Sequence, residues 1–435
     1  MSNAKNENLG ILIPEILLPK TDIDFSKWST VACDQFTSQP DYWEKVEEIV
    51  ASDPSTFRIT FPEIFLENSD KKERIEKIRS TMKKYLEQNL FENHEGAVYL
   101  EREIAGKVRS GLIIALDLEK YDFNKGSQTL IRATEGTILS RIPPRVEIRD
   151  GAPLELPHIM VLIDDPQRTV VEPLEKYKNK KPLYDFDLML DGGHITGWLV
   201  NENELNSSID ALEKLADPVM FKKKYNIPND SGVLLFAMGD GNHSLATAKT
   251  VWEKHKKDLP ENHPLRYALV EIVNLYSDAL VFEPIHRVIF GLKQDIAESA
   301  KKYWPNLIIE KVDNENEMER IVKNDIGEQI CGFINENGYY IWKFTNPTNQ
   351  LAVGTLQSFL DDFVKNNAEK IDYIHGTKEV CALSKEKNNC GFFLPTLNKT
   401  DLFKTVIFDG ALPRKTFSMG EAQEKRYYLE CRKIS

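Results

Sequence analysis

One stretch of the sequence decides the expected fold: Gly232-Val-Leu-Leu-Phe-Ala-Met238, then Gly239-Asp-Gly-Asn-His-Ser244, then Leu245-Ala-Thr-Ala-Lys-Thr-Val-Trp252. Residues 232–238 are nearly all apolar, which is typical of a strand covered on both faces. Residues 244–257 have the apolar spacing of a helix. The sequence therefore predicts a buried strand that turns into a helix through residues 239–244.

The loop between this strand and this helix is the best candidate for a chemical site. Gly239 and Gly241 permit positive φ and a close backbone approach, and the first free amides of the helix favour an anion such as phosphate. Asp240 is suited to binding magnesium or accepting a proton. His243 is suited to donating to a phosphate oxygen and to carrying charge near neutral pH.

The same loop has a purely structural interpretation. The glycines would then form a tight turn, and Asn242 or Ser244 would cap the helix rather than contact a ligand. The sequence contains neither the Gly-x-x-x-x-Gly-Lys-Ser/Thr pattern of a P-loop nor the Gly-x-Gly-x-x-Gly pattern of a dinucleotide fold, so neither fold is claimed.

Strands and helices alternate on both sides of this stretch, which indicates a mixed α/β protein. We expect a helix at 71–89, a hairpin at 97–104 and 108–116, a strand at 158–163, and further strands at 267–275 and 405–408. The predicted division is a main body at 1–290, a small α/β lobe at 291–345 and a C-terminal α/β section at 346–435 that packs back on the body.

A second polar segment is rich in arginine. Arg132, Arg141, Arg145 and Arg149 lie close together in the sequence, and guanidinium groups suit bidentate recognition of phosphate or carboxylate. We expect this segment and the loop at 239–244 to converge on one pocket, with Glu135 as the local acid or base. The alternative is a set of surface ion pairs.

Other histidines are weaker candidates. His286 and Arg287 follow an apolar strand and a proline, where a strand end would present them to a cleft, although a buried structural histidine is the competing interpretation. A metal hydrolase built on His194, His243 and His286 ranks last, because the sequence has no short ligand spacing of the His-Glu-x-x-His kind. We therefore expect no protein-bound metal site.

Composition excludes several classes of protein. The chain has 435 residues and a formal charge of −12 with dispersed basic residues, which disfavours nucleic acid as a partner. No apolar run reaches the ~20 residues that span a bilayer, and the N-terminus lacks the pattern of a signal peptide. Five scattered cysteines form no disulfide framework or zinc motif, and an activated Cys33 nucleophile is the minor alternative. A cytoplasmic protein is expected.

The loop and several other segments also resemble a known family. In this sequence a strand is followed by an Asp-Gly-x-His motif and then by a helix with small residues. This arrangement is similar to the Asp-Gly-His-His-Arg segment of the bacterial and archaeal domain-of-unknown-function family 1015. Segments that agree in order are Phe57-Arg-Ile-Thr-Phe-Pro-Glu63, Arg109-Ser-Gly-Leu112, Pro284-Ile-His-Arg287, Tyr373-Ile-His375 and Leu412-Pro-Arg-Lys-Thr416. The resemblance covers almost the whole chain, but this sequence has Asn242 for the first histidine and Ser244 for the arginine.

The resemblance implies a fold and a class of ligand. The family's loop is in turn similar to the phosphate-binding loop of the ParB and sulfiredoxin superfamily, which includes nucleotide-binding switches and a kinase acting on free serine. It implies a ParB/sulfiredoxin-like core with a mixed sheet and additional α/β lobes. It also implies ATP or ADP with magnesium as the cofactor, and a small-molecule substrate.

Two functions follow from these expectations. The first is a nucleotide-dependent phosphotransferase or hydrolase. In it the loop and the arginines hold phosphate together with His286 and Arg287, and Asp34, Glu135 or Asp240 serves as base or magnesium ligand beside His243. The second is a regulatory protein that binds a nucleotide or anion without chemistry. The sequence leaves open whether the chain forms a homo-oligomer.

Overall fold

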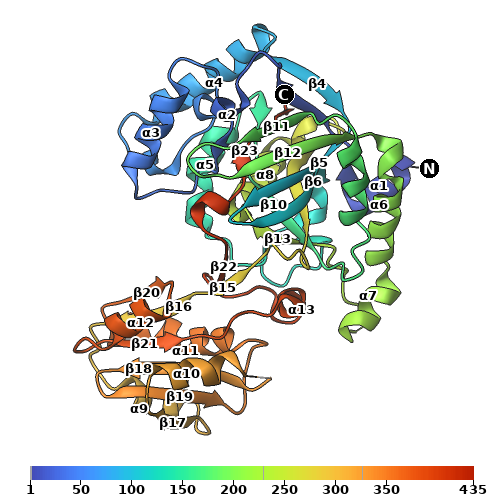
Figure 1. The fold of residues 1–435 in the computed structure, drawn as a ribbon. Helices are drawn as coiled ribbons and strands as arrows, with labels where there is room; N and C mark the ends of the chain where they lie inside the picture. The colour runs from blue at the N-terminus through green and yellow to red at the C-terminus, as the bar shows by residue number, and fades with distance from the viewer. Residues whose placement is uncertain (1, 229, 326) are drawn as a thin grey trace. The chain divides into compact units, whose positions relative to one another are not determined.

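The structure is a computed structural model that describes residues 2–228, 230–325 and 327–435 (Figure 1). The chain forms two compact units, one made of residues 1–280 and 420–435 and the other of residues 281–419. These boundaries differ from the predicted 1–290, 291–345 and 346–435. The predicted lobe at 291–345 shares a sheet with later strands, and the last residues of the chain belong to the first unit.

The first unit is built on a mixed sheet of ten strands. Its order is β11 (Tyr184–Asp187), β12 (His194–Val200), β5 (Ala97–Ile104), β6 (Lys107–Asp117), β14 (Tyr267–Asn274), β10 (Met160–Ile163), β13 (Phe236–Asp240), β8 (Ile131–Arg132) and β7 (Tyr121–Asp122), with β1 (Ile11–Leu12) beside β6. The pairs β10–β14, β13–β8 and β7–β8 are parallel, and the other pairs are antiparallel. This confirms the mixed α/β class and the hairpin of β5 and β6.

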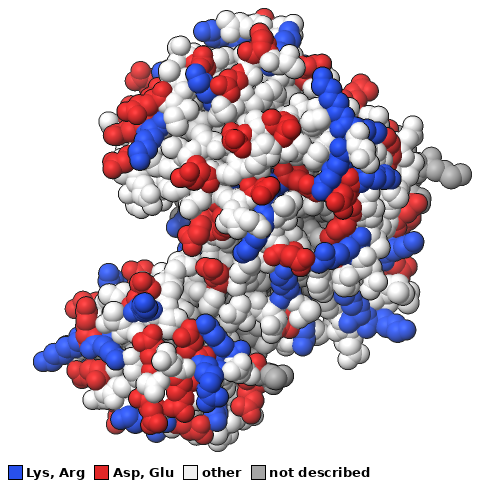
Figure 2. All heavy atoms as spheres, viewed as in Figure 1, with Lys and Arg blue, Asp and Glu red and all other residues white. Residues whose placement is uncertain are grey.

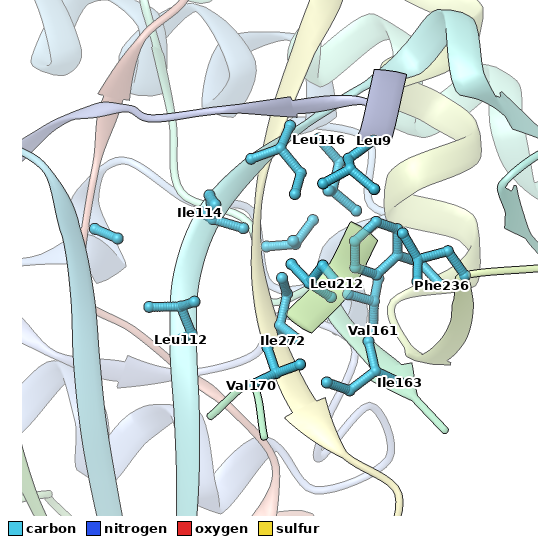
Figure 3. Close-up of a cluster of buried hydrophobic side chains, with 14 of the residues drawn as sticks. Leu9, Leu112, Ile114, Leu116, Val161, Ile163, Val170, Leu212, Phe236 and Ile272 are labelled. Atoms are coloured by element: carbon cyan, nitrogen blue, oxygen red, sulfur yellow. The ribbon is translucent and has the colours of Figure 1, made fainter. Parts of the chain in front are cut away.

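Apolar side chains cover both faces of this sheet. Along β6, Leu112, Ile114 and Leu116 enter one core and Ile113 enters the other, because successive side chains of a strand point to opposite faces. Figure 3 shows the first core, in which Leu112, Ile114 and Leu116 belong to one cluster with Val161 of β10 and Phe236 of β13. The long apolar strands of the sequence are thus explained by burial on two sides.

Helices complete the two faces. Figure 1 shows α1 (Ser2–Leu9) and α6 (Glu202–Leu215) on one side of the sheet, and α2 (Phe25–Trp28), α3 (Pro40–Val50) and α4 (Lys71–Glu87) on the other. The remaining helices of this unit are α5 (Ile142–Arg149), α7 (Pro218–Tyr225) and α8 (Asn242–His255).

Three small sheets tie distant segments to this core. They are β2 (Glu15–Pro19) with β4 (Phe91–Glu95), β3 (Thr30–Val31) with β23 (Tyr427–Tyr428), and β9 (Leu154–Glu155) with β24 (Arg432–Lys433). The second and third of these carry the C-terminal segment, residues 420–435, into the first unit.

The second unit has its own sheet of six strands, and all of its strand pairs are antiparallel. The order is β17 (Ile308–Val312), β19 (Gly338–Phe344), β18 (Gln329–Asn335), β21 (Cys390–Phe393), β16 (His286–Phe290) and β20 (Lys370–Ile374), and β15 (Phe282–Pro284) pairs with β22 (Phe417–Met419). Its helices are α9 (Ile296–Tyr303), α10 (Glu315–Lys323), α11 (Ala352–Asn367), α12 (Thr377–Ser384) and α13 (Lys399–Asp409).

One predicted strand is wrong. Residues 405–408 were expected to be extended, but they lie inside α13. Leu402, Phe403 and Val406 are buried on one face at helical spacing, and Gly410 ends the helix in the left-handed conformation. A short apolar run cannot by its periodicity be assigned to strand or helix, and here the flanking glycine identifies the helix end.

Among the described residues, no helix is both long and apolar enough to cross a membrane. On the face drawn in Figure 2, basic and acidic side chains are interspersed within each unit. The dispersed charge of the sequence is therefore also dispersed on this surface.

Candidate functional site

The junction of β13 and α8 forms as the sequence predicts, with a shift of a few residues. β13 ends at Asp240, Gly241 is the N-cap with φ of +79°, and α8 begins at Asn242. Neither Asn242 nor Ser244 caps the helix, so this part of the structural interpretation is wrong. The Gly241 amide donates to Asp240 Oδ1 at 2.9 Å.

Three amides at the start of α8 have no hydrogen-bond acceptor in the described part of the chain. They belong to residues 242, 243 and 244, whereas the amide of Leu245 donates to the carbonyl of Gly241 at 3.0 Å. Partial positive charge therefore accumulates at this end of the helix. The carboxamide oxygen of Asn242 is buried without a partner among the described residues.

Gly241 is required by packing. A Cβ at this position would lie 3.0 Å from Cα of Ile159, the residue before β10, and the positive φ disfavours any side chain. The methyl group of an alanine would therefore contact Ile159. For this reason Gly241→Ala would test the fold of the loop and not the approach of a phosphate. Gly239 lies within β13.

His243 is neutral near pH 7, contrary to the expectation from its residue type. Burial, and then the charges of Arg145 and Arg141, lower its pKa to about 4. Its Nε2 accepts from the amide of Ile138 at 3.4 Å. The neutral ring then carries its proton on Nδ1, which is the nitrogen available to donate to a ligand.

Helix α5, which carries Arg145, packs against α8, and the arginines of the predicted segment differ in role. Arg145 on α5 pairs with Glu63, and its Nη1 donates to the carbonyl of Arg141 at 2.5 Å. Arg132 points away from the loop, because its guanidinium donates to the carbonyls of Thr129 (2.8 Å) and Gly232 (2.7 Å) at the start of the two strands. It therefore ties β8 to the segment before β13.

Glu135 lies on the segment that leads from β8 past the loop. On one side of it, Thr134 Oγ1 donates to the carbonyl of Met238 at 2.8 Å, and on the other the amide of Ile138 donates to His243. The backbone around Glu135 is thus held against β13 and the start of α8. The structure brings this candidate to the same end of the sheet as Asp240.

Asp34, which is half-buried, belongs to a chain of polar groups that reaches the buried His158 and Tyr428. His158 Nε2 lies 3.5 Å from Asp34 Oδ2, and His158 Nδ1 lies 2.9 Å from the hydroxyl of Tyr428, which accepts from the amide of Cys33 at 3.3 Å. Burial alone would raise the pKa of Asp34, but the attraction and hydrogen bond of His158 outweigh burial and hold that pKa below its usual range. Asp34 is therefore ionised.

The partner histidine is shifted in the opposite sense. Burial alone would lower the pKa of His158, but the charge and hydrogen bond of Asp34, with smaller contributions from Asp240 and Glu63, outweigh burial and raise it. Burial raises the pKa of the Cys33 thiol. The negative charges of Asp34 and Glu63 raise it further, because they repel a thiolate. The alternative of Cys33 as an activated nucleophile has no support in this environment.

Further charges come from residues far away in the sequence. Lys425 Nζ, on the C-terminal segment, lies 3.3 Å from Asp240 Oδ2. Burial raises the pKa of Glu63 despite its pair with Arg145. The cluster thus holds three acidic groups (Asp34, Glu63 and Asp240) facing three basic groups (Arg145, His158 and Lys425), beside the start of α8.

Two predicted site residues lie elsewhere. His286 and Arg287 are buried in the sheet of the second unit: the amide of Leu394 donates to His286 Nδ1 at 3.0 Å, and the Arg287 guanidinium donates to Gln357 Oε1 at 3.2 Å and to the carbonyl of Arg414 at 3.2 Å. Burial lowers the pKa of His286 to about 3. These contacts favour the structural interpretation.

The histidines of the metal-hydrolase alternative are not assembled into a site within a unit. His194 lies on β12 with its ring nitrogens 2.7 Å from Asp187 and 2.7 Å from Asp185, whereas His243 starts α8 and His286 is in the second unit. Over the described residues, no group of three or more His, Cys, Asp or Glu side chains is arranged to hold a metal ion.

Sequence reasoning missed His158, Glu63, Lys425 and Tyr428. None lies in a local motif: His158 precedes a short strand, Glu63 follows an apolar segment, and the other two lie near the C-terminus. The segment from Phe57 to Glu63 resembles the family, and this resemblance is the signal in the sequence for Glu63. The others are brought to the cluster only by the pairing of β10 with β13 and of β23 with β3.

Comparison with solved structures finds distant likenesses. A mutant of free serine kinase in complex with AMP is 12% identical with a TM-score of 0.38 over 74% of this chain and 92% of that one. A conserved hypothetical protein from Pyrococcus furiosus is 10% identical with a TM-score of 0.35 over 73% and 90%. SbnI with a C-terminal truncation, from Staphylococcus aureus, is 10% identical with a TM-score of 0.36 over 71% and 83%.

No curated protein matches the sequence. A family model does match, over residues 17–363, and it spans every strand of the ten-stranded sheet except β1, as well as the junction of β13 with α8. The chain belongs to the family described as protein of unknown function (DUF1015).

Proposed function

We propose that the chain is a nucleotide-dependent phosphotransferase or phosphohydrolase acting on a small molecule, with the phosphates bound at the start of α8. The observation that carries the proposal is the set of three free amides at residues 242–244 beside a cluster of ionised side chains. Such amides and the helix dipole favour phosphate over uncharged ligands. The loop's resemblance to nucleotide-binding loops points to a nucleotide.

The groups around the amides suit a polyphosphate. Neutral His243 has a proton on Nδ1 to donate to a phosphate oxygen, and Arg145 and Lys425 supply positive charge nearby. Arg141 contributes charge from the turn before α5, as its effect on the pKa of His243 indicates. Arg132, His286 and Arg287 have no part in this proposal, because their side chains serve the strands that carry them.

Asp34 is the residue best placed to act on a substrate hydroxyl. Its carboxylate is kept ionised by His158, so it is ready to orient the hydroxyl and accept its proton as the phosphoryl group is transferred. Asp240 and Glu135 lie at the same end of β13. In this mechanism the protein mainly positions the reactants and stabilises charge, which is how phosphoryl transfer is generally catalysed.

Magnesium fits the donor set as part of a nucleotide complex. Magnesium is commonly held by one or two carboxylates together with substrate phosphates rather than by a cage of protein ligands. Asp34 and Asp240 are hard oxygen donors of that kind, and the described residues contain no larger ligand group. When bound, the metal would neutralise charge on the phosphates.

Binding and turnover test the proposal in two steps. The melting temperature is measured with ATP or ADP, with and without magnesium, since ligand at ~100 times its dissociation constant adds ~2.7 kcal/mol of stability. Phosphate release and transfer are then measured with hydroxylated small molecules as acceptors. Binding together with turnover supports the proposal, and the absence of any nucleotide-dependent shift contradicts it.

Variants locate the site. Asp34→Asn is expected to abolish turnover while leaving nucleotide affinity within a few-fold, and Asp258→Asn, an exposed aspartate after α8, is the matched control. His243→Ala is expected to weaken nucleotide binding by about 1–3 kcal/mol, the scale of a hydrogen bond to a charged group. Unchanged affinity in His243→Ala would reject the start of α8 as the phosphate site.

A regulatory protein that binds without chemistry remains the second candidate. The observation in its favour is that residues 239–244 contain neither lysine nor arginine, where the resemblance would lead one to expect an arginine at Ser244. Nucleotide binding without turnover under every acceptor tested would favour this function.

A further inference from the structure

The C-terminal segment contributes a lysine to the cluster beside α8. Lys425 Nζ lies 3.3 Å from Asp240 Oδ2, and the Lys425 side chain is only 16% exposed. An ammonium group has three hydrogens to donate, and Asp240 is the one carboxylate within ion-pair distance among the described residues. Lys425 also contributes to holding the pKa of Asp34 low, so its charge reaches both carboxylates.

The backbone on both sides of Lys425 is held by buried groups. Arg102, which is 1% exposed, donates to the carbonyls of Lys425 (2.7 Å) and Gln423 (2.6 Å). The next residue, Arg426, pairs with Glu271 at 2.9 Å and with Glu430 at 2.5 Å. The backbone that carries Lys425 is therefore held by buried groups of the first unit.

The loop at 239–244 itself has no cation. Its histidine is neutral, and residues 239–244 contain neither lysine nor arginine. Asp240 next to the free amides adds negative charge, which would oppose an incoming phosphate unless a cation lies close by. Lys425 is the basic side chain in ion-pair contact with this aspartate.

We propose that Lys425 binds a phosphate of the ligand directly, as a cation that the C-terminal segment supplies to a loop with no cation of its own. The inference rests on the proposed function, since it assigns a ligand contact within that same site. Lys425 would donate to Asp240 and to a phosphate oxygen together, so that one ammonium group bridges the carboxylate and the ligand. The carbonyl contacts of Arg102 keep the lysine in place for that purpose.

Calorimetric titration of the full-length protein with magnesium–ADP and with inorganic pyrophosphate tests the inference. Lys425→Gln should weaken binding of both probes at least 10-fold, whereas Lys425→Arg, which keeps the charge, should stay within a few-fold of the unmodified protein. The matched control is Lys433→Gln, which removes an exposed lysine from the same segment and should leave affinity unchanged. Lys425→Met, which keeps the apolar stem, provides a second measurement if Lys425→Gln lowers the melting temperature.

The outcomes separate this inference from the proposed function. If the unmodified protein binds a probe and both Lys425→Gln and Lys425→Met bind it equally well, the role of Lys425 is wrong and the proposed function stands. If the unmodified protein binds neither magnesium–ADP nor pyrophosphate, the proposed function fails and the inference fails with it. An equal loss in Lys425→Gln and Lys433→Gln would show a general charge effect and would also overturn the inference.

Discussion

At the scale of single residues, His243 shows how much an environment changes a side chain. Its residue type predicts a group that titrates near neutral pH, but burial and the charges of Arg145 and Arg141 lower its pKa to about 4. A histidine that stays neutral is a donor and acceptor of fixed geometry. Its proposed contact with phosphate therefore does not depend on protonation at pH 6–8.

The shifted pKa makes a prediction about stability. Between about pH 4 and 6.5 the unfolded chain takes up a proton at His243 that the folded chain does not, so this histidine lowers the free energy of unfolding as the pH falls through that window. After allowance for solvent screening of a partly exposed ring, the effect is about 1–2 kcal/mol. His243→Gln should show a flatter dependence of unfolding free energy on pH from 6.5 to 4, measured by urea denaturation.

The comparison with His243→Gln isolates this one group. His286, whose pKa is lowered to about 3, adds a dependence of the same sign, and His158, whose pKa is raised, adds one of the opposite sign. Both remain in the variant. Parallel pH profiles for the variant and the unmodified protein would show that His243 does not have the lowered pKa.

At the scale of elements, the turn from β13 into α8 depends on one glycine. Gly241→Ala should lower the free energy of unfolding by more than the cost of positive φ alone, which is about 1–2 kcal/mol, because its Cβ would also crowd Ile159. Gly126→Ala is the matched control, since Gly126 has φ of +82° with no atom near the added carbon. Equal losses in the two variants, measured by chemical denaturation, would show that contact with Ile159 is unimportant.

The C-terminal segment depends on buried ion pairs. Glu271 of β14 is fully buried and pairs with both Arg109 and Arg426; burial alone would raise its pKa, but the two arginines outweigh burial and lower it. Arg426→Met leaves Glu271 and Glu430 short of a partner and should lower the free energy of unfolding by about 3–5 kcal/mol. The surface pair of Lys27 with Asp53 provides the control.

Lys27→Met breaks that exposed pair and should change stability little, because surface ion pairs are screened by solvent. Denaturant unfolding of both variants gives the comparison. A loss in Arg426→Met no larger than the loss in Lys27→Met would contradict a structural role for the buried pairs of the C-terminal segment.

At the scale of the whole molecule, the division at residues 280 and 420 makes the second unit continuous in sequence and the first unit discontinuous. Residues 281–419 contain a complete six-stranded sheet and two apolar cores of their own. Expressed alone, this fragment should melt cooperatively by circular dichroism. A fragment of residues 1–419 should be unstable, because it lacks Arg426 and the strands β23 and β24, which belong to the first unit.

Much of the fold could be predicted from local patterns. The strand and helix around residues 239–244, the hairpin of β5 and β6 and helix α4 lie within a few residues of their predicted bounds, because each has a clear apolar period. The predicted strand at 405–408 and the boundaries at 290 and 345 failed. At 405–408 a short apolar run did not distinguish a strand from a helix, and at the two boundaries the strands that share the sheet lie later in the chain.

One part of the candidate site could likewise be predicted from local sequence, and the other part could not. The sequence by itself predicted that a strand is followed by a helix N-terminus near residues 239–244, since apolar spacing and two glycines suffice for that, and the helix begins at Asn242. Only the tertiary structure brought Asp34, His158 and Lys425 to that point, turned Arg132 away and made His243 neutral. Contacts and pKa shifts depend on burial and on charges from distant segments, which local sequence does not contain.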